Sequence, residues 1–140
     1  MVNLAAVEII DDTITGSIFH AYLNPEGKKS AKGAFDVHQL RDSFLSEQPL
    51  FGSVADELIE FIGDAELSFY NRNFDMSFLQ SEFDKCGYDA VFSRDYKSSC
   101  LMKDFADKEN YGKWLKLDAA CVMGLIFPNE KRMELQLTLY

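Results

Sequence analysis

Residues 66–79, with the sequence ELSFYNRNFDMSFL, constrain the fold most strongly, because they change from a strand pattern to a helix pattern. Residues 66–70 form a β-like run, whereas the apolar residues of 74–86 recur at helical spacing. Asn73 is the predicted N-cap of this helix, and Gly87 is its predicted end. A strand that leads through a short turn into a helix is typical of α/β proteins, in which helices pack against a sheet.

The predicted helix 74–86 carries an apolar stripe and a carboxylate in its first turn. The stripe consists of Phe74, Phe78, Leu79 and Phe83. We predict that it belongs to the core and is not a surface for stacking nucleic-acid bases. Asp75 has two interpretations, as an acidic residue that stabilises the helix start through the helix dipole or as a functional group. Asn71 and Asn73 are either turn and cap residues or substrate contacts.

The first part of the chain is predicted to form a β-hairpin followed by helices. Residues 2–10 and 17–23 have strand patterns, and the residues of 11–16 favour a turn between them. Further along, Ser53 is the predicted N-cap of an amphipathic helix, and Gly63 is its predicted end. The hairpin and the later strand at 66–70 thus supply the first three strands of a sheet.

The remaining elements complete a predicted mixed sheet. Short helices are expected at 38–45, 98–108 and 116–125. In the tail, RMELQLTLY, apolar residues alternate with polar ones, which predicts a strand at 133–139. This order of elements indicates an α/β fold with helices packed against the sheet, and the length is that of one domain spanning 1–140.

Composition argues against several classes of function, but not against a nucleic-acid enzyme whose substrate contact is small and metal-mediated. The net charge of −9 argues against broad, charge-driven binding to nucleic acid or to anionic membranes. No apolar run approaches the roughly 18 residues of a membrane-spanning helix, and the N-terminal sequence lacks the basic region of a signal peptide. Lys28, Lys29 and Lys32 form a basic cluster, which is either a solvated loop or a phosphate contact.

The cysteines and histidines indicate a cytoplasmic protein without a zinc site. We expect the three cysteines to be reduced and mostly buried, because they form no CxxC pair; they are Cys86, Cys100 and Cys121. The only histidines are His20 and His38, too few for typical zinc coordination. His20 lies within the predicted second strand and is interpreted as structural, whereas His38 either begins a short helix or contacts a substrate.

Several stretches resemble, in order, the DnaQ-type (DEDDh) 3′–5′ exonuclease domain, the family of the proofreading epsilon subunit of bacterial DNA polymerase III. Together they cover nearly the whole chain, and their order is more specific than any single motif. One departure lies in the second stretch, where Gln39 replaces the usual Gly of Val-His-Gly-Ile. The stretches are AAVEII…ITGSIFHAYLNPEG, FDVHQL, PLFGSVADELIEFIGDAEL, NRNFDMSFLQSEF and LKLDAACVMGLI.

The resemblance implies a ribonuclease H-like mixed sheet and phosphodiester hydrolysis with two divalent ions, Mg²⁺ or Mn²⁺. Asp75 occupies the position of the metal-ligating Asp in the family's Asn-x-x-Phe-Asp motif. The implied partners are a DNA 3′ end or a polymerase subunit. The implied nucleic-acid contacts are His38, Asn71, Asn73 and Phe74.

The sequence departs from the family at its first and third motifs. The Asp-x-Glu-Thr-Thr-Gly strand, which lies centrally in the family's sheet, does not precede residues 2–10. At the third motif, the alignment puts Leu135 and Tyr140 where the family has His and Asp. Tyr140 or Tyr111 could be invoked as in a Tyr-based variant of the family, but one family carboxylate cannot organise two ions.

We therefore predict a degenerate homologue without nuclease activity that acts as a binding or interaction module. The central gap in the sheet is expected to be filled by 133–139, or else by a second copy of the chain or a strand from a partner. One alternative is an active exonuclease completed by a partner chain or by non-family residues, and another is a late-start fragment of a longer gene product. The carboxylates to consider in the active alternative are Asp11, Asp12, Asp75, Asp118 and Glu134.

Overall fold

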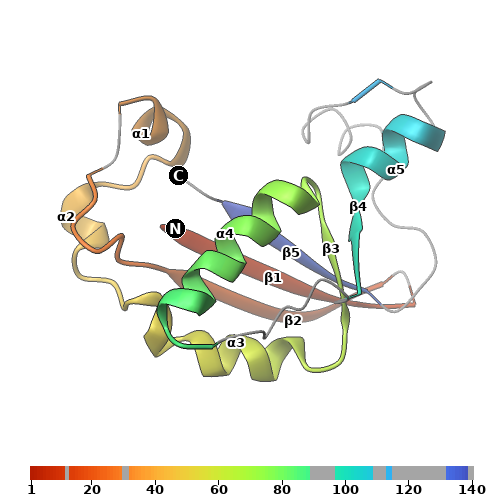
Figure 1. Cartoon of the computed structure of the whole chain (residues 1–140), viewed down its shortest axis with the longest axis horizontal. Helices are drawn as coiled ribbons and strands as arrows, with labels where there is room; N and C mark the ends of the chain where they lie inside the picture. Colours follow the sequence, from red (N-terminus) through yellow and green to blue (C-terminus); the bar gives the residue numbers. More distant parts are fainter. Residues whose placement is uncertain (12, 30–31, 89–96, 109–112, 115–131, 139–140) are drawn as a thin grey trace.

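The computed structural model describes the chain except residues 12, 30–31, 89–96, 109–112, 115–131 and 139–140 (Figure 1). The strands are β1 (Asn3–Ile10), β2 (Thr13–Tyr22), β3 (Glu66–Phe69), β4 (Ser98–Cys100) and β5 (Arg132–Thr138). The helices are α1 (Lys32–His38), α2 (Asp42–Leu45), α3 (Ala55–Ile62), α4 (Arg72–Lys85) and α5 (Leu101–Lys108), with a 3₁₀ turn, η1, at Phe51–Ser53. In this part of the chain, no helix is long and apolar enough to cross a membrane.

The five strands form one mixed sheet in the order β2-β1-β5-β3-β4. The hairpin strands β1 and β2 are antiparallel, and β5 runs antiparallel to β1. On its other side, β5 runs parallel to β3, which in turn runs parallel to β4. The mixed sheet flanked by helices confirms the predicted α/β class.

The C-terminal strand β5 occupies the centre of the sheet, between the hairpin and β3 (Figure 1). Leu135 is paired with Ala6 of β1, and Glu134 lies between Val7 of β1 and Ser68 of β3. The expectation that the alternating tail fills the central gap is confirmed. The strands β1 and β3 do not pair with each other. Without β5, their backbone N–H and C=O groups on the facing sides would be unpaired at two open sheet edges.

The hairpin has a shorter turn than predicted, because β2 begins at Thr13 and not at residue 17. Val7 pairs with Ile18 and Ile9 pairs with Ile14, so three residues of β2 stand opposite Glu8 alone. Gly16, with φ of 90°, lies within this irregularity. The extra residues interrupt the alternation of side chains along β2. For this reason the strand pattern of the sequence was recognisable only from residue 17 onwards.

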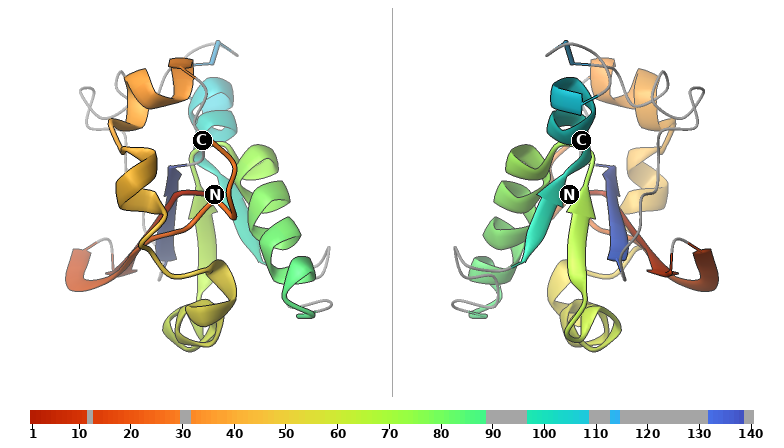
Figure 2. Two further views of the ribbon diagram at one scale, coloured as in Figure 1. Left: turned by 90° about the vertical axis from the view of Figure 1, so that its left-hand side faces the viewer. Right: turned by 90° about the vertical axis from the view of Figure 1, so that its right-hand side faces the viewer.

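The core lies between the sheet and the helices α3 and α4 (Figure 2). Leu4, Ala6 and Phe19 contribute from the hairpin, while Leu67 and Phe69 contribute from β3. The helices cover these residues with Ala55, Leu58 and Ile62 of α3 and with Leu79 and Phe83 of α4. This packing fixes the start of α4 at the end of β3.

Both predicted N-caps are wrong, whereas both predicted glycine ends are confirmed. Ser53 belongs to η1, so that α3 begins after Val54. The N-cap of α4 is Asn71 and not Asn73, and neither helix has a side-chain cap bond. Gly63 and Gly87, which follow the two helices, have positive φ values of 53° and 78°, a backbone conformation that glycine adopts without steric cost.

Two predicted helices are divided differently in the structure. The expected helix 38–45 is replaced by the end of α1 and by α2, because Gln39 takes a φ of 60° and interrupts the helical path. The expected helix 98–108 begins as β4 and becomes α5 only at Leu101. Pairing with β3 draws residues 98–100 into the sheet against their local preference. The expected helix 116–125 lies outside the described residues.

The apolar stripe of α4 is only half buried, which corrects the prediction that all four residues belong to the core. Leu79 and Phe83 are fully buried, but Phe74 is 48% exposed and Phe78 is 39% exposed. The rings of Phe74 and Phe78 contact each other, with centroids 4.9 Å apart. Asp75 shares the buried face of α4 instead. The buried-thiol prediction is likewise wrong for Cys86, which is exposed, whereas Cys100 is intermediate and Cys121 is not described.

Truncation of Phe83 and Phe78 to Ala distinguishes the two sides of α4. Phe83→Ala is expected to lower the free energy of unfolding by about 3–5 kcal/mol, because it leaves a cavity in the core. Phe78→Ala, the matched control on the same helix, is expected to cost less than about 1.5 kcal/mol. Urea unfolding followed by circular dichroism measures both. Similar losses for the two variants would contradict the assigned burial.

Proline at position 134 tests the central place of β5. Glu134→Pro removes a backbone N–H from a strand that is paired on both sides, and it is expected to cost at least about 1–3 kcal/mol. The control Glu134→Gln retains the N–H and is expected to stay within about 0.5 kcal/mol of wild type. Equal urea midpoints for the Pro and Gln variants would show that residue 134 is not in a central ladder.

Candidate functional site

The candidate site lies where β3 ends and α4 begins. Leu67 and Phe69 are fully buried and fix β3 in the sheet, and the chain then turns at Tyr70 and Asn71 into the helix. Asp75 follows in the first turn of α4. The strand, turn and helix predicted from residues 66–86 are therefore present, with the helix starting slightly earlier than expected.

Asp75 is almost fully buried, with 8% of its surface exposed. The backbone N–H of Asn71 donates to Oδ2 of Asp75 at 3.3 Å, and the N–H of Asp75 donates to the carbonyl of Asn71 at 3.0 Å. Burial raises the pKa of the Asp75 carboxyl to about 6, an effect that the hydrogen bond from Asn71 partly offsets. The carboxylate thus closes the first turn of α4 in an environment that disfavours its charge.

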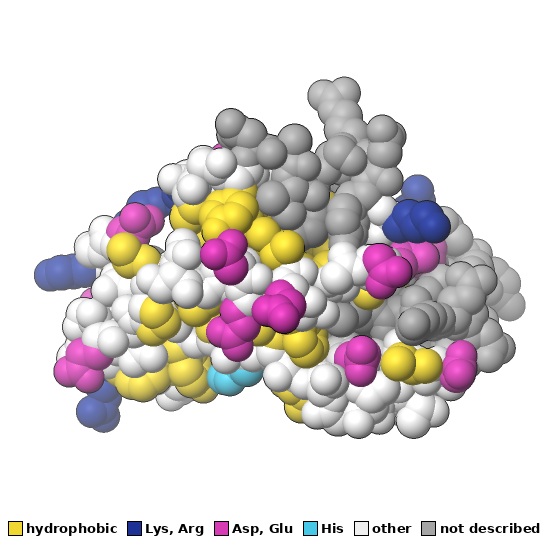
Figure 3. Space-filling view, turned by 90° about the horizontal axis from the view of Figure 1, so that it is seen from below, with side chains coloured by type: hydrophobic (Ala, Val, Ile, Leu, Met, Phe, Trp, Pro, Cys, Tyr) yellow, Lys and Arg dark blue, Asp and Glu magenta, His cyan; other side chains and the backbone are white. Residues whose placement is uncertain are grey.

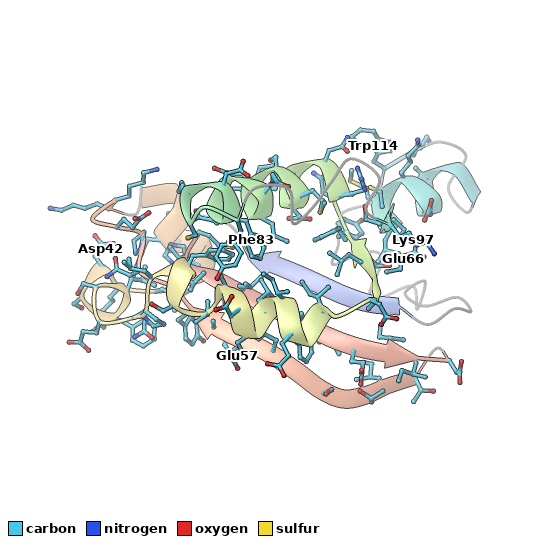
Figure 4. All side chains as sticks on the ribbon, turned by 60° about the horizontal axis from the view of Figure 1, so that its bottom comes forward. Asp42, Glu57, Glu66, Phe83, Lys97 and Trp114 are labelled. Atoms are coloured by element: carbon cyan, nitrogen blue, oxygen red, sulfur yellow. The ribbon has the colours of Figure 1, made fainter. Side chains whose placement is uncertain are left out.

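The far side of the junction is fixed by β4 and α5. Arg72 Nε donates to the hydroxyl of Ser98 at 2.6 Å, and the N–H of Met102 donates to the Tyr70 carbonyl at 3.0 Å. At the other end of this strand pair, the N–H of Leu67 donates to the carbonyl of Lys97. In Figure 4 Lys97 lies beside Glu66, at the start of the two strands. These bonds give the turn before Asp75 a defined geometry.

Three of the four predicted nucleic-acid contacts lie beside Asp75, and the fourth lies on another element. Asn71 is half-buried beside Asp75, and Asn73 and Phe74 are exposed on the same helical turn. His38 is at the end of α1, where its Nδ1 accepts a hydrogen bond from the N–H of Leu40 at 2.9 Å. Contact of these residues with nucleic acid remains a prediction.

Asp11 and Asp75 lie at opposite ends of β3. Arg132 pairs with Glu66 on one side and with Ile9 on the other, so the start of β3 is level with the end of β1. Asp11 follows β1, whereas Asp75 follows the end of β3. At about 3.3 Å per residue, the length of β3 separates the two backbone positions by roughly 10 Å or more, so the register does not bring Asp11 and Asp75 together.

The described donors do not fit a two-metal centre. Glu134 lies at the register position of Ser68, and Asp12 and Asp118 lie outside the described residues. No three His, Cys, Asp or Glu side chains within the described part of the chain are grouped so as to hold a metal ion. Mg²⁺ takes about six oxygen ligands, and a buried carboxyl whose pKa is raised is a poor first donor.

A buried acidic residue on α4, paired with the exposed Lys85, was missed from the sequence. Glu82 is 8% exposed and accepts a hydrogen bond from Lys85 Nζ at 3.0 Å. The Glu and Lys three residues apart were a usable signal, but such pairs are usually exposed and carry little information. His20, by contrast, fits its structural interpretation, because its Nε2 lies 2.8 Å from Oδ1 of Asn3 across the hairpin.

The mixed sheet, with a carboxyl group at the strand-to-helix junction, defines a ribonuclease H-like domain. The family model RNase T, described as an exonuclease, matches residues 1–123. The chain belongs to this exonuclease family. The strand β5 lies beyond the matched residues.

Curated relatives point to the same family. The chain is 36% identical over 127 residues to the DNA polymerase III subunit epsilon of Salmonella typhimurium, covering 86% of the chain and 49% of that protein. The same figures hold for the subunit from Escherichia coli K12. The Rickettsia felis subunit is 38% identical over 82 residues, covering 59% of the chain and 35% of that protein. The chain thus spans about half, or less, of the length of these relatives.

Replacing Asp75 by Asn tests the burial of its charge. The folded-state pKa of about 6 lies above the ordinary value of 3.8, so folded Asp75 binds more protons and its contribution to stability falls as pH rises from about 4 to 6. Asp75→Asn is expected to raise the free energy of unfolding by about 1–3 kcal/mol at pH 8, with the difference vanishing near pH 3.5. Urea unfolding at several pH values measures this difference, and a destabilised Asn variant at pH 8 would contradict it.

Proposed function

We propose that this chain is a degenerate member of the exonuclease family, that it lacks nuclease activity of its own, and that it acts as a binding or interaction module. The observation that carries the proposal is the occupant of the central strand position. The family resemblance assigns this position to the strand with the Asp-x-Glu motif, and here β5 lies between β1 and β3.

The sequence of β5, RMELQLT, contains one carboxylate, and its register position is not the one next to the candidate site. Glu134 is level with Ser68, before the end of β3. Continuing the parallel register by two residues brings Gln136 level with Tyr70, next to the turn that leads to Asp75. The backbone positions nearest the candidate site therefore belong to uncharged residues, which are weaker ligands for Mg²⁺ or Mn²⁺ than carboxylates.

The environment of Asp75 supports a structural role. A metal ligand must be ionised to bind, and metal binding competes with protonation. The Asp75 carboxyl has a pKa raised to about 6 by burial, and one of its oxygens accepts a hydrogen bond from Asn71. We assign Asp75 the role of closing the first turn of α4, which keeps the β3–α4 junction of the family without its chemistry.

The relatives suggest the class of partner. They are named as epsilon subunits of DNA polymerase III, and this name makes a polymerase subunit the first candidate partner. A DNA 3′ end is the second candidate partner, supported by the exposed Asn73 and Phe74 beside Asp75. The alternative function is an active 3′–5′ exonuclease completed by a partner chain, which the retained Asp75 favours.

A 3′-exonuclease assay on 5′-labelled single-stranded DNA tests the proposal. The purified chain is expected to give no shortening with Mg²⁺ or Mn²⁺, under conditions in which a proofreading exonuclease degrades the DNA. Asp75→Asn is the matched variant, since it changes the carboxyl to an amide of the same shape. Metal-dependent shortening that disappears in Asp75→Asn would overturn the proposal in favour of a functional site.

A further inference from the structure

Strand β2 forms an open edge of the sheet. It is paired with β1 on one side and is the first strand in the sheet order. Figure 4 shows no other described helix or strand beyond this edge. The pairing with β1 is regular from Ile18 to Ala21, because the irregularity around Gly16 lies before this segment. Charged side chains and Pro usually protect such an edge from strand pairing, and the sequence of β2 contains no Lys, Arg, Asp, Glu or Pro.

The two sides of this edge differ in chemistry. On the core side, Phe19 of β2 contacts Phe61 of α3, with ring centroids 5.9 Å apart, so α3 runs beside the edge. Glu57, one helical turn before Phe61, is exposed and lies next to β2 in Figure 4. Ile18, which alternates with Phe19 and so lies on the opposite face of the sheet, is 60% exposed. The edge is therefore flanked by a carboxylate on one face and by an apolar side chain on the other.

The surface around the edge is acidic over a wide area. Residues 1–27 and 42–71, which include the hairpin and α3, contain acidic residues but no Lys or Arg. Asp56, Glu57 and Glu60 of α3 are all exposed. Figure 3, which views the molecule from below, where α3 lies, shows acidic side chains among apolar ones. This charge repels a second copy of the chain, which has the same net charge of −9, and attracts a cationic partner.

We infer that the β2 edge binds an extended segment of another protein, in which basic residues alternate with apolar ones. A strand added to an open edge forms backbone hydrogen bonds with it, and its successive side chains lie on opposite faces of the enlarged sheet. Basic side chains of the added strand lie on the face of Phe19 and Ala21, next to the carboxylates of α3. Apolar side chains on the other face pack against Ile18.

The inference rests on the proposed role as an interaction module and adds a surface and a class of partner to it. The surface is separate from the β3–α4 junction, since β1 and β5 lie between β2 and β3 in the sheet. Nuclease activity and peptide binding are measured by different readouts. Absence of peptide binding overturns this inference alone, whereas metal-dependent shortening of DNA overturns the proposed lack of activity alone.

Fluorescence anisotropy with a labelled synthetic peptide of about seven residues, in which Lys alternates with Val, tests the inference. One control peptide has Glu in place of Lys, and a second is N-methylated on every residue, which preserves its charge but removes its backbone donors. The Lys–Val peptide is expected to bind at least about tenfold more tightly than either control, and less tightly as salt is raised. Equal binding of the N-methylated peptide would attribute the binding to charge alone and overturn the inference.

Variants of the chain locate the binding surface. Glu57→Lys is expected to weaken binding of the Lys–Val peptide at least about threefold, because it reverses a charge beside the edge. Asp36→Lys is the matched control: Asp36 is exposed on α1, which lies apart from α3 and β2 in Figure 1, and its change alters the net charge equally. Equal effects of the two variants would overturn the inference.

Circular dichroism establishes that each variant is folded, and Ile18→Lys provides a second test if Glu57→Lys is not. Ile18→Lys is expected to weaken binding at least about threefold, because it removes an apolar contact and repels the peptide. Leu50→Lys is its control, since Leu50 is 48% exposed outside β2. Sedimentation of the chain without peptide tests the other occupant: a dimer that Ile18→Lys dissociates and Leu50→Lys does not would assign the edge to a second copy and overturn the inference.

Discussion

The rest of the structure depends on the pairing of β5 with β1 on one side and with β3 on the other. Without this strand, the described sheet separates into a hairpin and a short parallel pair, since β1 and β3 are not neighbours. Neither piece has enough strands to bury a core by itself. The core residues Leu4 and Ala6 of β1 face the same helices as Leu67 and Phe69 of β3, and β5 makes that shared core possible.

The same pairing determines the chemistry of the candidate site. Whichever strand lies beside the end of β3 decides which side chains stand near Asp75. With β5 in place, the backbone nearest the turn is that of uncharged residues, and Asp11 is at the far end of the sheet. Asp75 itself is buried, and this burial raises the pKa of its carboxyl to about 6. The fold of the family is retained, and within the described residues no three potential ligands are grouped so as to hold a metal ion.

Local patterns predicted the elements whose ends are set by local chemistry. The change from strand to helix after Tyr70 and the positive-φ positions Gly63 and Gly87 are examples. The alternating tail was also recognisable, and its central position followed from the resemblance together with the cost of open edges.

Other features depend on tertiary packing and were not predictable from local patterns. The exposure of Phe74 and Phe78 depends on how the β3–α4 turn rotates the helix, and helical spacing leaves that rotation undetermined. Ser is a common N-cap residue, but Ser53 forms the end of the 3₁₀ turn η1, and α3 begins only after Val54. The burial of Asp75 likewise follows from that rotation, so its raised pKa could not be predicted from its place in a first helical turn.

The most direct test of the central position of β5 is a nuclear Overhauser measurement of its contacts with β1 and β3 in the isotopically labelled chain. The central position of β5 predicts cross-strand backbone contacts of Leu135 with Ala6, in the antiparallel pattern, and of Glu134 with Ser68, in the parallel pattern. Contacts on both sides would establish β5 as the central strand. Contacts between β1 and β3 in their place, with residues 132–138 outside the sheet, would contradict both the fold described here and the function proposed from it.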